Sequence, residues 1–338
     1  MKTSIKKKIN NMNLKKVRFW IQVFTFFIIV YGGYFAIDIG DKLPTFACVF
    51  NPDGTGGKCY LGMIQHDLKH PWESFLGFAG VTFLISLSIF ILWVWLLNKS
   101  WCGYVCPLGT MQDWLTLLRE KLKIRFSEYD WANRKMIKSI KWILLILLLI
   151  IPVMISNSLL GLPTLPNGLS MPFCDICPGR MMIPAFTGDF SQFYIDFSNP
   201  ADLIMTTLGM IMVGLFLIGS FIKKRFFCYF CPMAALQYTF SKPALLKLYK
   251  DGSKCTKCGD CYRACDMDIL EIADDVTSKN LVTQDCTLCL KCVAACPEEG
   301  CLEANFAGKT IFESTKEGFI LRMAMDKKEQ TGNDKNEN

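Results

Sequence analysis

The stretch WCGYVCPLGTMQDW, residues 101–114, begins where a long apolar run ends. It carries two cysteines four residues apart, and a proline follows the second cysteine. The stretch FFCYFCPMAALQYTF, residues 226–240, also follows an apolar run and shares the pattern Cys-Pro-x4-Gln. This repetition predicts two equivalent halves, each with its own cysteine pair: Cys102 and Cys106 in the first half, Cys228 and Cys231 in the second.

Apolar runs of membrane length organise the chain around these motifs. Of the 338 residues, 51% are hydrophobic, which is high for a soluble protein. A helix that crosses a bilayer needs roughly 20 apolar residues, and four stretches are long enough: Val17–Ile37, Phe75–Leu97, Ile140–Leu160 and Leu203–Ile222. We therefore predict an α-helical membrane protein whose four transmembrane helices form two repeated hairpins.

Basic residues are unevenly shared between the two sides of the predicted membrane. Seven lie within the first 18 residues, and eight lie in the loop after the second span. The two loops on the other side hold only Lys42, Lys58, Lys69 and Arg180. Because cytoplasmic loops carry an excess of Lys and Arg, we predict a multi-pass protein of the cytoplasmic (inner) membrane with both termini in the cytoplasm.

Eight of the 17 cysteines form two runs between residues 255 and 296, each spaced C-x2-C-x2-C-x3-C. This is the spacing of bacterial two-cluster ferredoxins, in which the fourth cysteine of each run ligates the other cluster. Structural zinc is disfavoured, because its sites usually combine two separated pairs. We predict a small C-terminal α+β domain with two [4Fe-4S] clusters, one held by Cys255, Cys258, Cys261 and Cys296, the other by Cys286, Cys289, Cys292 and Cys265. Asp266 replaces the proline of the ferredoxin pattern, and Cys301 is expected to be a buried thiol outside the ligand sets.

The opening motifs supply a further cysteine set. Both lie at the cytoplasmic end of a predicted hairpin, and sites at the interface of internal repeats are common in membrane proteins. We expect a third [4Fe-4S] cluster held by Cys102, Cys106, Cys228 and Cys231. Zinc or another metal, or free redox-active thiols, remain alternatives, whereas a disulfide is disfavoured in a reducing compartment.

The predicted outer loops hold four more cysteines and both histidines. Cys48, Cys59, Cys174 and Cys177 form either disulfides or a fourth cluster at the outer face. His66 and His70 stand four residues apart and are either interfacial surface residues or hydrogen-bonding groups for a quinone head. No predicted span contains a histidine and no C-x-x-C-H motif occurs, so we expect no haem.

These predictions divide the chain into four parts. They are a basic cytoplasmic N-terminus (1–16), a membrane domain with two Cys-Pro repeats (17–250), a two-cluster ferredoxin domain (251–305) and a polar tail (306–338). The last stretch of the tail, DKKEQTGNDKNEN (326–338), is expected to be disordered.

Four spans, two Cys-Pro motifs at the membrane edge and a C-terminal two-cluster ferredoxin together resemble the NapH/NosR-like membrane polyferredoxins. The resemblance covers residues 17–305 and implies a quinol dehydrogenase-type subunit that passes electrons between quinol and a periplasmic or membrane redox partner, with no role for nucleic acid. This chain departs from the family in its second motif, which is C-x2-C-P rather than C-x3-C-P. Its more elaborate outer cysteine set and the lack of a periplasmic flavin domain are further departures. The alternative is a membrane ferredoxin that reduces metal ions during the maturation of a metalloenzyme such as a copper oxidase. No catalytic residue is assigned.

Overall fold

The computed structural model describes residues 7, 9–32, 59–75, 77–124, 131–158 and 163–335. The chain divides into two compact units. The ferredoxin unit comprises Met1–Ile21, Trp95–Tyr104 and Phe240–Asn338, and the membrane unit comprises Gln22–Val94 and Val105–Thr239. The ferredoxin unit is therefore assembled from three separate stretches of the sequence.

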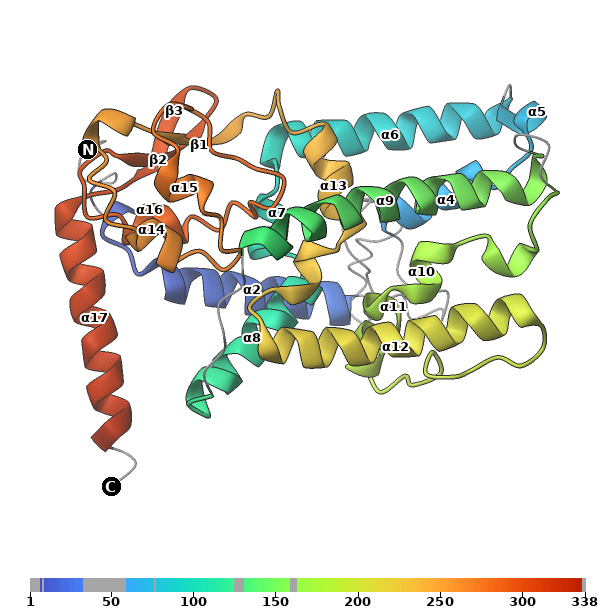
Figure 1. The fold of residues 1–338 in the computed structure, drawn as a ribbon, viewed down its shortest axis with the longest axis horizontal. Helices are drawn as coiled ribbons and strands as arrows, with labels where there is room; N and C mark the ends of the chain where they lie inside the picture. Colours follow the sequence, from blue (N-terminus) through green and yellow to red (C-terminus); the bar gives the residue numbers. More distant parts are fainter. Residues whose placement is uncertain are drawn as a thin grey trace. The chain divides into compact units, whose positions relative to one another are not determined.

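Long apolar helices dominate the membrane unit (Figure 1). They are α6 (Phe78–Leu97), α9 (Trp131–Ser156) and α12 (Pro200–Ile222). Within the described residues, the windows Gly80–Leu97, Met136–Ser156 and Pro200–Ile222 are long and apolar enough to cross a membrane. These three predicted spans are thus confirmed. The fourth, Val17–Ile37, begins within α2 (Leu14–Tyr31) and continues beyond the described residues.

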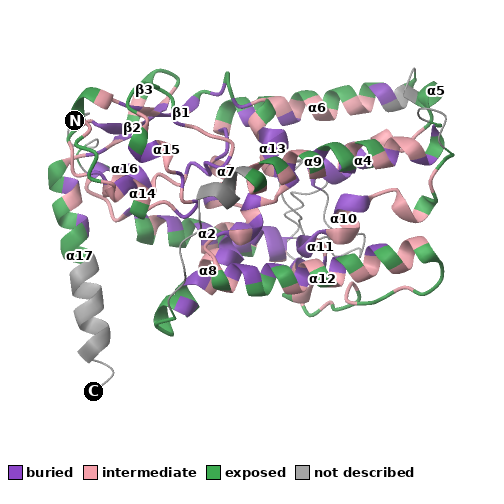
Figure 2. Ribbon diagram, viewed as in Figure 1, coloured by how far each residue is buried: buried purple, intermediate pink, exposed green. Residues whose placement is uncertain are grey.

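The outer faces of these helices are apolar. Figure 2 shows exposed residues along α6, α9 and α12, and many of them are large and hydrophobic. Examples are Leu84, Leu92, Ile143, Ile146, Ile211 and Ile218, each more than half exposed. Monomeric soluble proteins rarely expose contiguous apolar surfaces of this kind. The faces are suited to lipid, where apolar side chains avoid contact with water.

Shorter helices fill the rest of the membrane unit, and several begin at a proline that follows a cysteine. Proline suits the first helical turn, because its missing N–H would have no partner there and its φ is already helical. The shorter elements are α4 (Tyr60–Leu68), α5 (Trp72–Phe75), α8 (Pro107–Lys121), η2 (Asn167–Leu169), α10 (Pro172–Ile176), α11 (Pro178–Ala185), η3 (Phe226–Tyr229) and α13 (Pro232–Thr239). Cysteine precedes the proline of α8, α11 and α13, so these prolines orient the cysteines at the helix starts.

The ferredoxin unit contains a three-stranded antiparallel sheet of β1 (Leu246–Lys250), β2 (Leu302–Phe306) and β3 (Lys309–Glu313), in that order. Alternate residues of β1 are buried, as expected for a strand with one face on the core. The accompanying helices are α7 (Ser100–Tyr104), η4 (Gly252–Lys254), α14 (Asp260–Arg263), α15 (Glu271–Asp274), α16 (Lys291–Ala295) and α17 (Lys316–Lys335).

The predicted polar tail, 306–338, forms regular structure over most of its length. Its first residues complete the sheet through β3, and α17 follows. The Arg322 guanidinium fastens α17 by donating to the carbonyl oxygens of Ala294 (2.9 Å) and Asn10 (2.6 Å). The ordered domain also begins before the predicted residue 251, because β1 is its first strand. A polar sequence therefore hides elements that are held by buried contacts.

Candidate iron–sulfur sites

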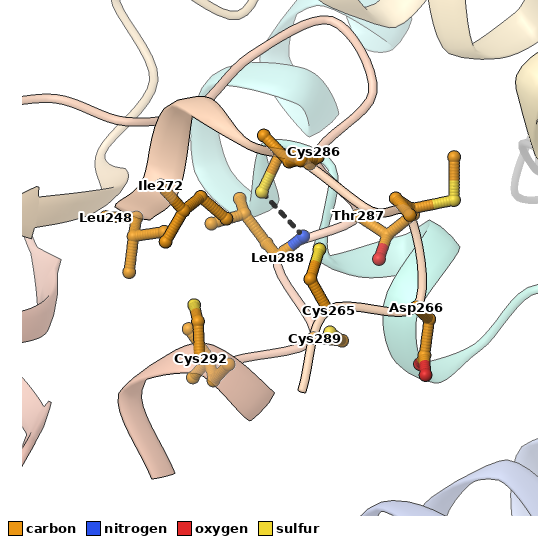
Figure 3. Close-up of a pocket in the computed structure, with 12 residues that line it drawn as sticks. Leu248, Cys265, Asp266, Ile272, Cys286, Thr287, Leu288, Cys289 and Cys292 are labelled. Carbon is orange, nitrogen blue, oxygen red and sulfur yellow. Dashed lines mark hydrogen bonds between the residues drawn. The ribbon is translucent and has the colours of Figure 1, made fainter. Parts of the chain in front are cut away.

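Two cysteine-lined pockets lie in the ferredoxin unit. The pocket in Figure 3 is lined by Cys265, Cys286, Cys289 and Cys292. The other is lined by Cys255, Cys258, Cys261 and Cys296, with Cys301 as a fifth cysteine. Each pocket therefore combines three cysteines of one run with the fourth cysteine of the other run, which is the crossed grouping that the spacing predicts.

The loops between the cysteines turn through left-handed backbone conformations at matching positions of the two runs. The first run has Lys257 (φ 56°) and Gly259 (φ 78°), and the second has Leu288 (φ 51°) and Leu290 (φ 61°). Such a conformation costs a non-glycine residue about 1–3 kcal/mol and concentrates at functional sites. The turn also brings the Leu288 N–H within 3.4 Å of the Cys286 sulfur, the contact dashed in Figure 3.

The chemistry of the Figure 3 pocket fits a [4Fe-4S] cluster. Burial raises the pKa of the Cys286 thiol to about 11 and that of Cys292 well above its ordinary value. Neighbouring cysteine sulfurs raise both further, so four bare thiolates would repel one another here. Bound iron would offset that repulsion, because its positive charge stabilises the deprotonated thiolates that coordinate it. Among the described residues, no group of three or more His, Cys, Asp or Glu side chains is placed to hold a single metal ion.

Cys301 has a clearer place than its sequence suggested. It is buried, its thiol donates to the Asp251 carbonyl oxygen (3.7 Å), and it lines the same pocket as Cys296. It therefore lies beside a predicted ligand inside that pocket.

Asp266 is a structural residue that sequence reasoning missed. It is buried and accepts hydrogen bonds from Arg18 (3.2 Å) and Lys291 (2.7 Å). The unusual acid in the proline position of the ferredoxin pattern was the available signal. Its role is to tie α2 to the loop that carries Cys265.

Helix α7, which carries Cys102, packs directly on the Cys286–Cys289 loop. A Cβ atom at Gly103 would lie 2.5 Å from the Thr287 carbonyl oxygen, so only glycine permits this approach without a shift. The Tyr104 hydroxyl donates to the carbonyl oxygen of Cys289 (3.1 Å). The first Cys-Pro motif therefore starts in contact with a ferredoxin loop.

Cys106, Cys228 and Cys231 belong to the membrane unit, whereas Cys102 belongs to the ferredoxin unit. In the membrane unit, Gln112 connects α8 with the second motif. Its side-chain amide lies 3.6 Å from the Cys228 sulfur as a donor, and its oxygen accepts from the Phe227 N–H (2.9 Å). The fully buried Arg225 forms two hydrogen bonds with Asp113 (3.0 and 2.7 Å). The two repeats are thus joined through Gln112 and Asp113 of α8, which hold the residues just before and within the second motif.

Of the cysteines predicted for the outer face, Cys48 lies outside the described residues. Among the described residues, Cys59, Cys174 and Cys177 form no disulfide, and the Cys174 thiol is hydrogen-bonded to the Cys59 sulfur. His66 and His70 face each other with ring centroids 5.5 Å apart, and the His66 side chain is 54% exposed. Their proposed contact with a quinone stays a prediction.

Comparisons with known proteins agree with this chemistry. Residues 79–125 and 205–250 match a family described as "4Fe-4S binding domain", and residues 247–297 match one described as "4Fe-4S dicluster domain". The first match covers both Cys-Pro motifs as two copies. No solved structure matches the chain.

Several curated relatives are about a quarter identical to this chain over the aligned residues. The protein MJ0750 of Methanocaldococcus jannaschii is 26% identical over 74% of this chain and 87% of its own length. The ferredoxin-type protein NapH of Haemophilus influenzae is 24% identical over 64% of this chain and 66% of its own length. The regulatory protein NosR of Pseudomonas aeruginosa is 23% identical over 64% of this chain, which spans only 27% of NosR. The chain is therefore similar to the NapH/NosR-like membrane polyferredoxins and is an iron–sulfur electron-transfer protein with membrane helices.

Proposed function

We propose that this protein couples the quinone pool to a respiratory reductase through [4Fe-4S] clusters. The contact of α7 with the Cys286–Cys289 loop carries the proposal, because it joins the first Cys-Pro motif to a ferredoxin site through Gly103 and Tyr104. Electrons tunnel usefully only over short distances, so a ferredoxin outside the bilayer needs a neighbouring station at the membrane surface.

The stations of this relay are three cysteine sets. Two are the crossed ferredoxin sets, each with one [4Fe-4S] cluster. The third is the set of Cys102, Cys106, Cys228 and Cys231. In each of its two pairs, the second cysteine is followed directly by a proline. The clusters, when bound, supply one-electron carriers. The hydrogen bond from Gln112 to Cys228 supports the third set, because such bonds tune clusters.

The membrane arrangement belongs to the same proposal. We infer four spans, both termini in the cytoplasm and a location in the inner membrane, from the apolar runs and the distribution of Lys and Arg. Quinol would give up two electrons and two protons, and the electrons would enter the relay singly. The name of NapH as a ferredoxin-type protein supports electron transfer, and the partner is expected to be a membrane or periplasmic redox subunit.

The test compares Cys106→Ser with Cys265→Ser in the full-length protein, purified without oxygen. Cys106→Ser is expected to lose about 4 irons per chain, one cluster, to keep the ferredoxin spectrum and to lose reduction of the ferredoxin by quinol. Cys265→Ser is expected to lose ferredoxin iron and to retain reduction of the membrane set. Unchanged iron and unchanged quinol-linked reduction in Cys106→Ser would contradict the relay. Reduction of copper ions in place of quinone exchange would favour the maturation role.

A further inference from the structure

The segment that carries Cys174 and Cys177 reaches well along a membrane-spanning helix. A Cβ atom at Gly209 of α12 would lie 2.5 Å from the Asp175 carbonyl oxygen, so the two backbones touch there. Gly209 follows Pro200, the start of α12, by nine residues. At 1.5 Å per residue this is about 13 Å along the helix axis. Figure 1 shows α10 and α11 beside the central part of α12.

A second helix gives the same depth. Gln65 is fully buried, and its side chain donates to the Leu148 carbonyl oxygen of α9 (2.7 Å) while accepting from the Phe173 N–H (3.2 Å). Leu148 precedes Ser156, the end of α9, by eight residues, which is about 12 Å. The hydrocarbon core of a bilayer is about 30 Å thick. The Cys174 loop therefore lies beside residues well inside the ends of two helices that are long and apolar enough to span a membrane, deeper than the outer loop that the sequence predicted.

Backbone outside a long helix is stable at this depth only where protein encloses it, because lipid cannot satisfy its N–H and C=O groups. The Gln65 side chain accepts the hydrogen bond of the backbone N–H of Phe173, the residue before Cys174. The fully buried Gln65 side chain therefore holds the short helix α10 in place. The cost of such a break in regular helix indicates that the segment has a task that a continuous helix cannot perform.

Three cysteines converge at this break. The Cys174 thiol is hydrogen-bonded to the Cys59 sulfur, and both sulfurs adjoin Gly62, where a Cβ atom would lie 2.8 Å from Cys174 Sγ and 3.7 Å from Cys59 Sγ. The sulfurs of Cys59 and Cys106 are within electrostatic range of Cys177. The group is therefore compact, and it adjoins the first Cys-Pro motif within the same unit.

The chain contains four Cys-Pro pairs, and in three of them the cysteine belongs to a predicted cluster set. The fourth pair is Cys177-Pro178, which separates α10 from α11. The extended backbone of Cys177 (φ −76°, ψ 123°) is nearly that of Cys296 (φ −79°, ψ 124°). Proline favours this conformation in any preceding residue, so the matching backbone angles alone do not indicate a ligand. The argument for a ligand is that the Cys-Pro pair recurs here beside two further cysteines.

We propose that Cys59, Cys174 and Cys177 supply three thiolate ligands to an additional iron–sulfur cluster inside the membrane unit. A [4Fe-4S] cluster uses four thiolates, and the proposal makes no use of Cys48, which lies outside the described residues. The site goes beyond the relay proposed above and does not depend on which donor reduces it.

The experiment measures iron and acid-labile sulfide per chain in the anaerobically purified full-length protein. Cys174→Ser is expected to lose one cluster's content, about 4 irons for a [4Fe-4S] cluster, and to keep the ferredoxin spectrum. The matched control is Asp175→Asn, which breaks the neighbouring ion pair with Arg180 and leaves every cysteine in place. Its iron content is expected to equal that of the unmodified protein.

Wild-type iron in both Cys174→Ser and Cys177→Ser would overturn the site, as would a peptide cross-linked between Cys59 and Cys174 in unreduced protein. If the variants do not accumulate, the unmodified protein decides. More than about 12 irons per chain requires a site beyond three [4Fe-4S] clusters, and about 8 or fewer refutes it, because the two ferredoxin clusters alone account for about 8. About 12 irons supports the site if Cys106→Ser keeps that content and refutes it if Cys106→Ser falls to about 8. Cys106→Ser tests the relay separately, so the two proposals can fail independently.

Discussion

The two Cys-Pro motifs share a pattern but differ in what holds them. In each, a buried basic residue stands three positions before the first cysteine: Lys99 in the first motif and Arg225 in the second. Lys99 donates to the Gln284 carbonyl oxygen within the ferredoxin unit. Arg225 pairs with Asp113 within the membrane unit. The same position therefore fastens one motif to a ferredoxin loop and the other to a membrane helix.

The residue after the first cysteine shows the same divergence. It is Gly103 in the first motif, where a loop of the ferredoxin unit approaches too closely for a side chain. It is Tyr229 in the second motif, where the ring is 7% exposed and fills space inside the membrane unit. The comparison teaches that the two motifs share their cysteines and differ in the residues beside them, according to what each motif contacts.

The largest effect is expected from Arg225→Met in the second motif. It removes the cation from a buried pair and leaves the Asp113 carboxylate uncompensated, which costs about 3–5 kcal/mol. Thermal unfolding in detergent measures the loss. Lys224→Met is the matched control, because its pair with Glu120 is exposed and worth about 0–1 kcal/mol. Equal stability of the two variants would contradict the assigned role of Arg225.

Gly103→Val is expected to have the next largest effect, about 1–3 kcal/mol, because a side chain there overpacks against Thr287. It should also slow electron exchange with the ferredoxin, as measured by stopped-flow absorbance. Gly214→Val in α12 is the control, since nothing lies within 4 Å of a Cβ atom at that position. A Gly103→Val protein that behaves like Gly214→Val would show that α7 does not need its close approach.

Gln112→Leu tests the connection between the repeats. It removes the partner of the buried Phe227 N–H, at a cost of about 1–2 kcal/mol. It also removes the hydrogen bond to Cys228, which should lower the reduction potential of a cluster there, since such bonds stabilise the more negative reduced form. Potentiometric titration followed by EPR measures the shift. Gln237→Leu, the equivalent change in the second motif, provides the comparison, and an unshifted potential in Gln112→Leu would separate Gln112 from the site.

The smallest effect is expected from Tyr104→Phe, which deletes only the hydroxyl bond to Cys289 and costs about 0.5–1.5 kcal/mol. Tyr229→Phe makes the same change in the second motif, at the tyrosine that likewise stands two positions before the second cysteine. Chemical denaturation of the ferredoxin absorbance should respond to Tyr104→Phe alone. A response to both variants, or to neither, would contradict the claim that only the first motif is bonded to a ferredoxin loop.

Much of this organisation could be predicted from local patterns. Apolar runs located three confirmed spans, because membrane helices need about 20 apolar residues. Proline after cysteine marked the starts of α8, α11 and α13. The crossed cysteine grouping could also be predicted. Three cysteines of one tight loop reach only three irons of a [4Fe-4S] cluster, so the fourth ligand comes from the other run.

Depth and long-range pairing could not be predicted in this way. The Cys174 segment has the composition of an outer loop, and only the contacts of Gln65 and Gly209 place it beside the central parts of two helices. Asp266 was seen as a change in a loop, because its partner Arg18 is 248 residues away in the sequence. The polar C-terminal segment gave no sign that Arg322 would fasten it.

That long separation has a consequence for how the protein is made. Arg18 and Asp266 pair across 248 residues, and Arg322 bonds the backbone of Asn10 across 312 residues. Closing such loops costs entropy before any contact rewards it. The ferredoxin unit thus waits for nearly the whole chain to leave the ribosome, by which time the intervening apolar helices have already been delivered to the bilayer. Cluster loading is therefore expected to be a late step of biogenesis, and a ribosome stalled before residue 322 would leave a membrane-inserted but cluster-poor intermediate.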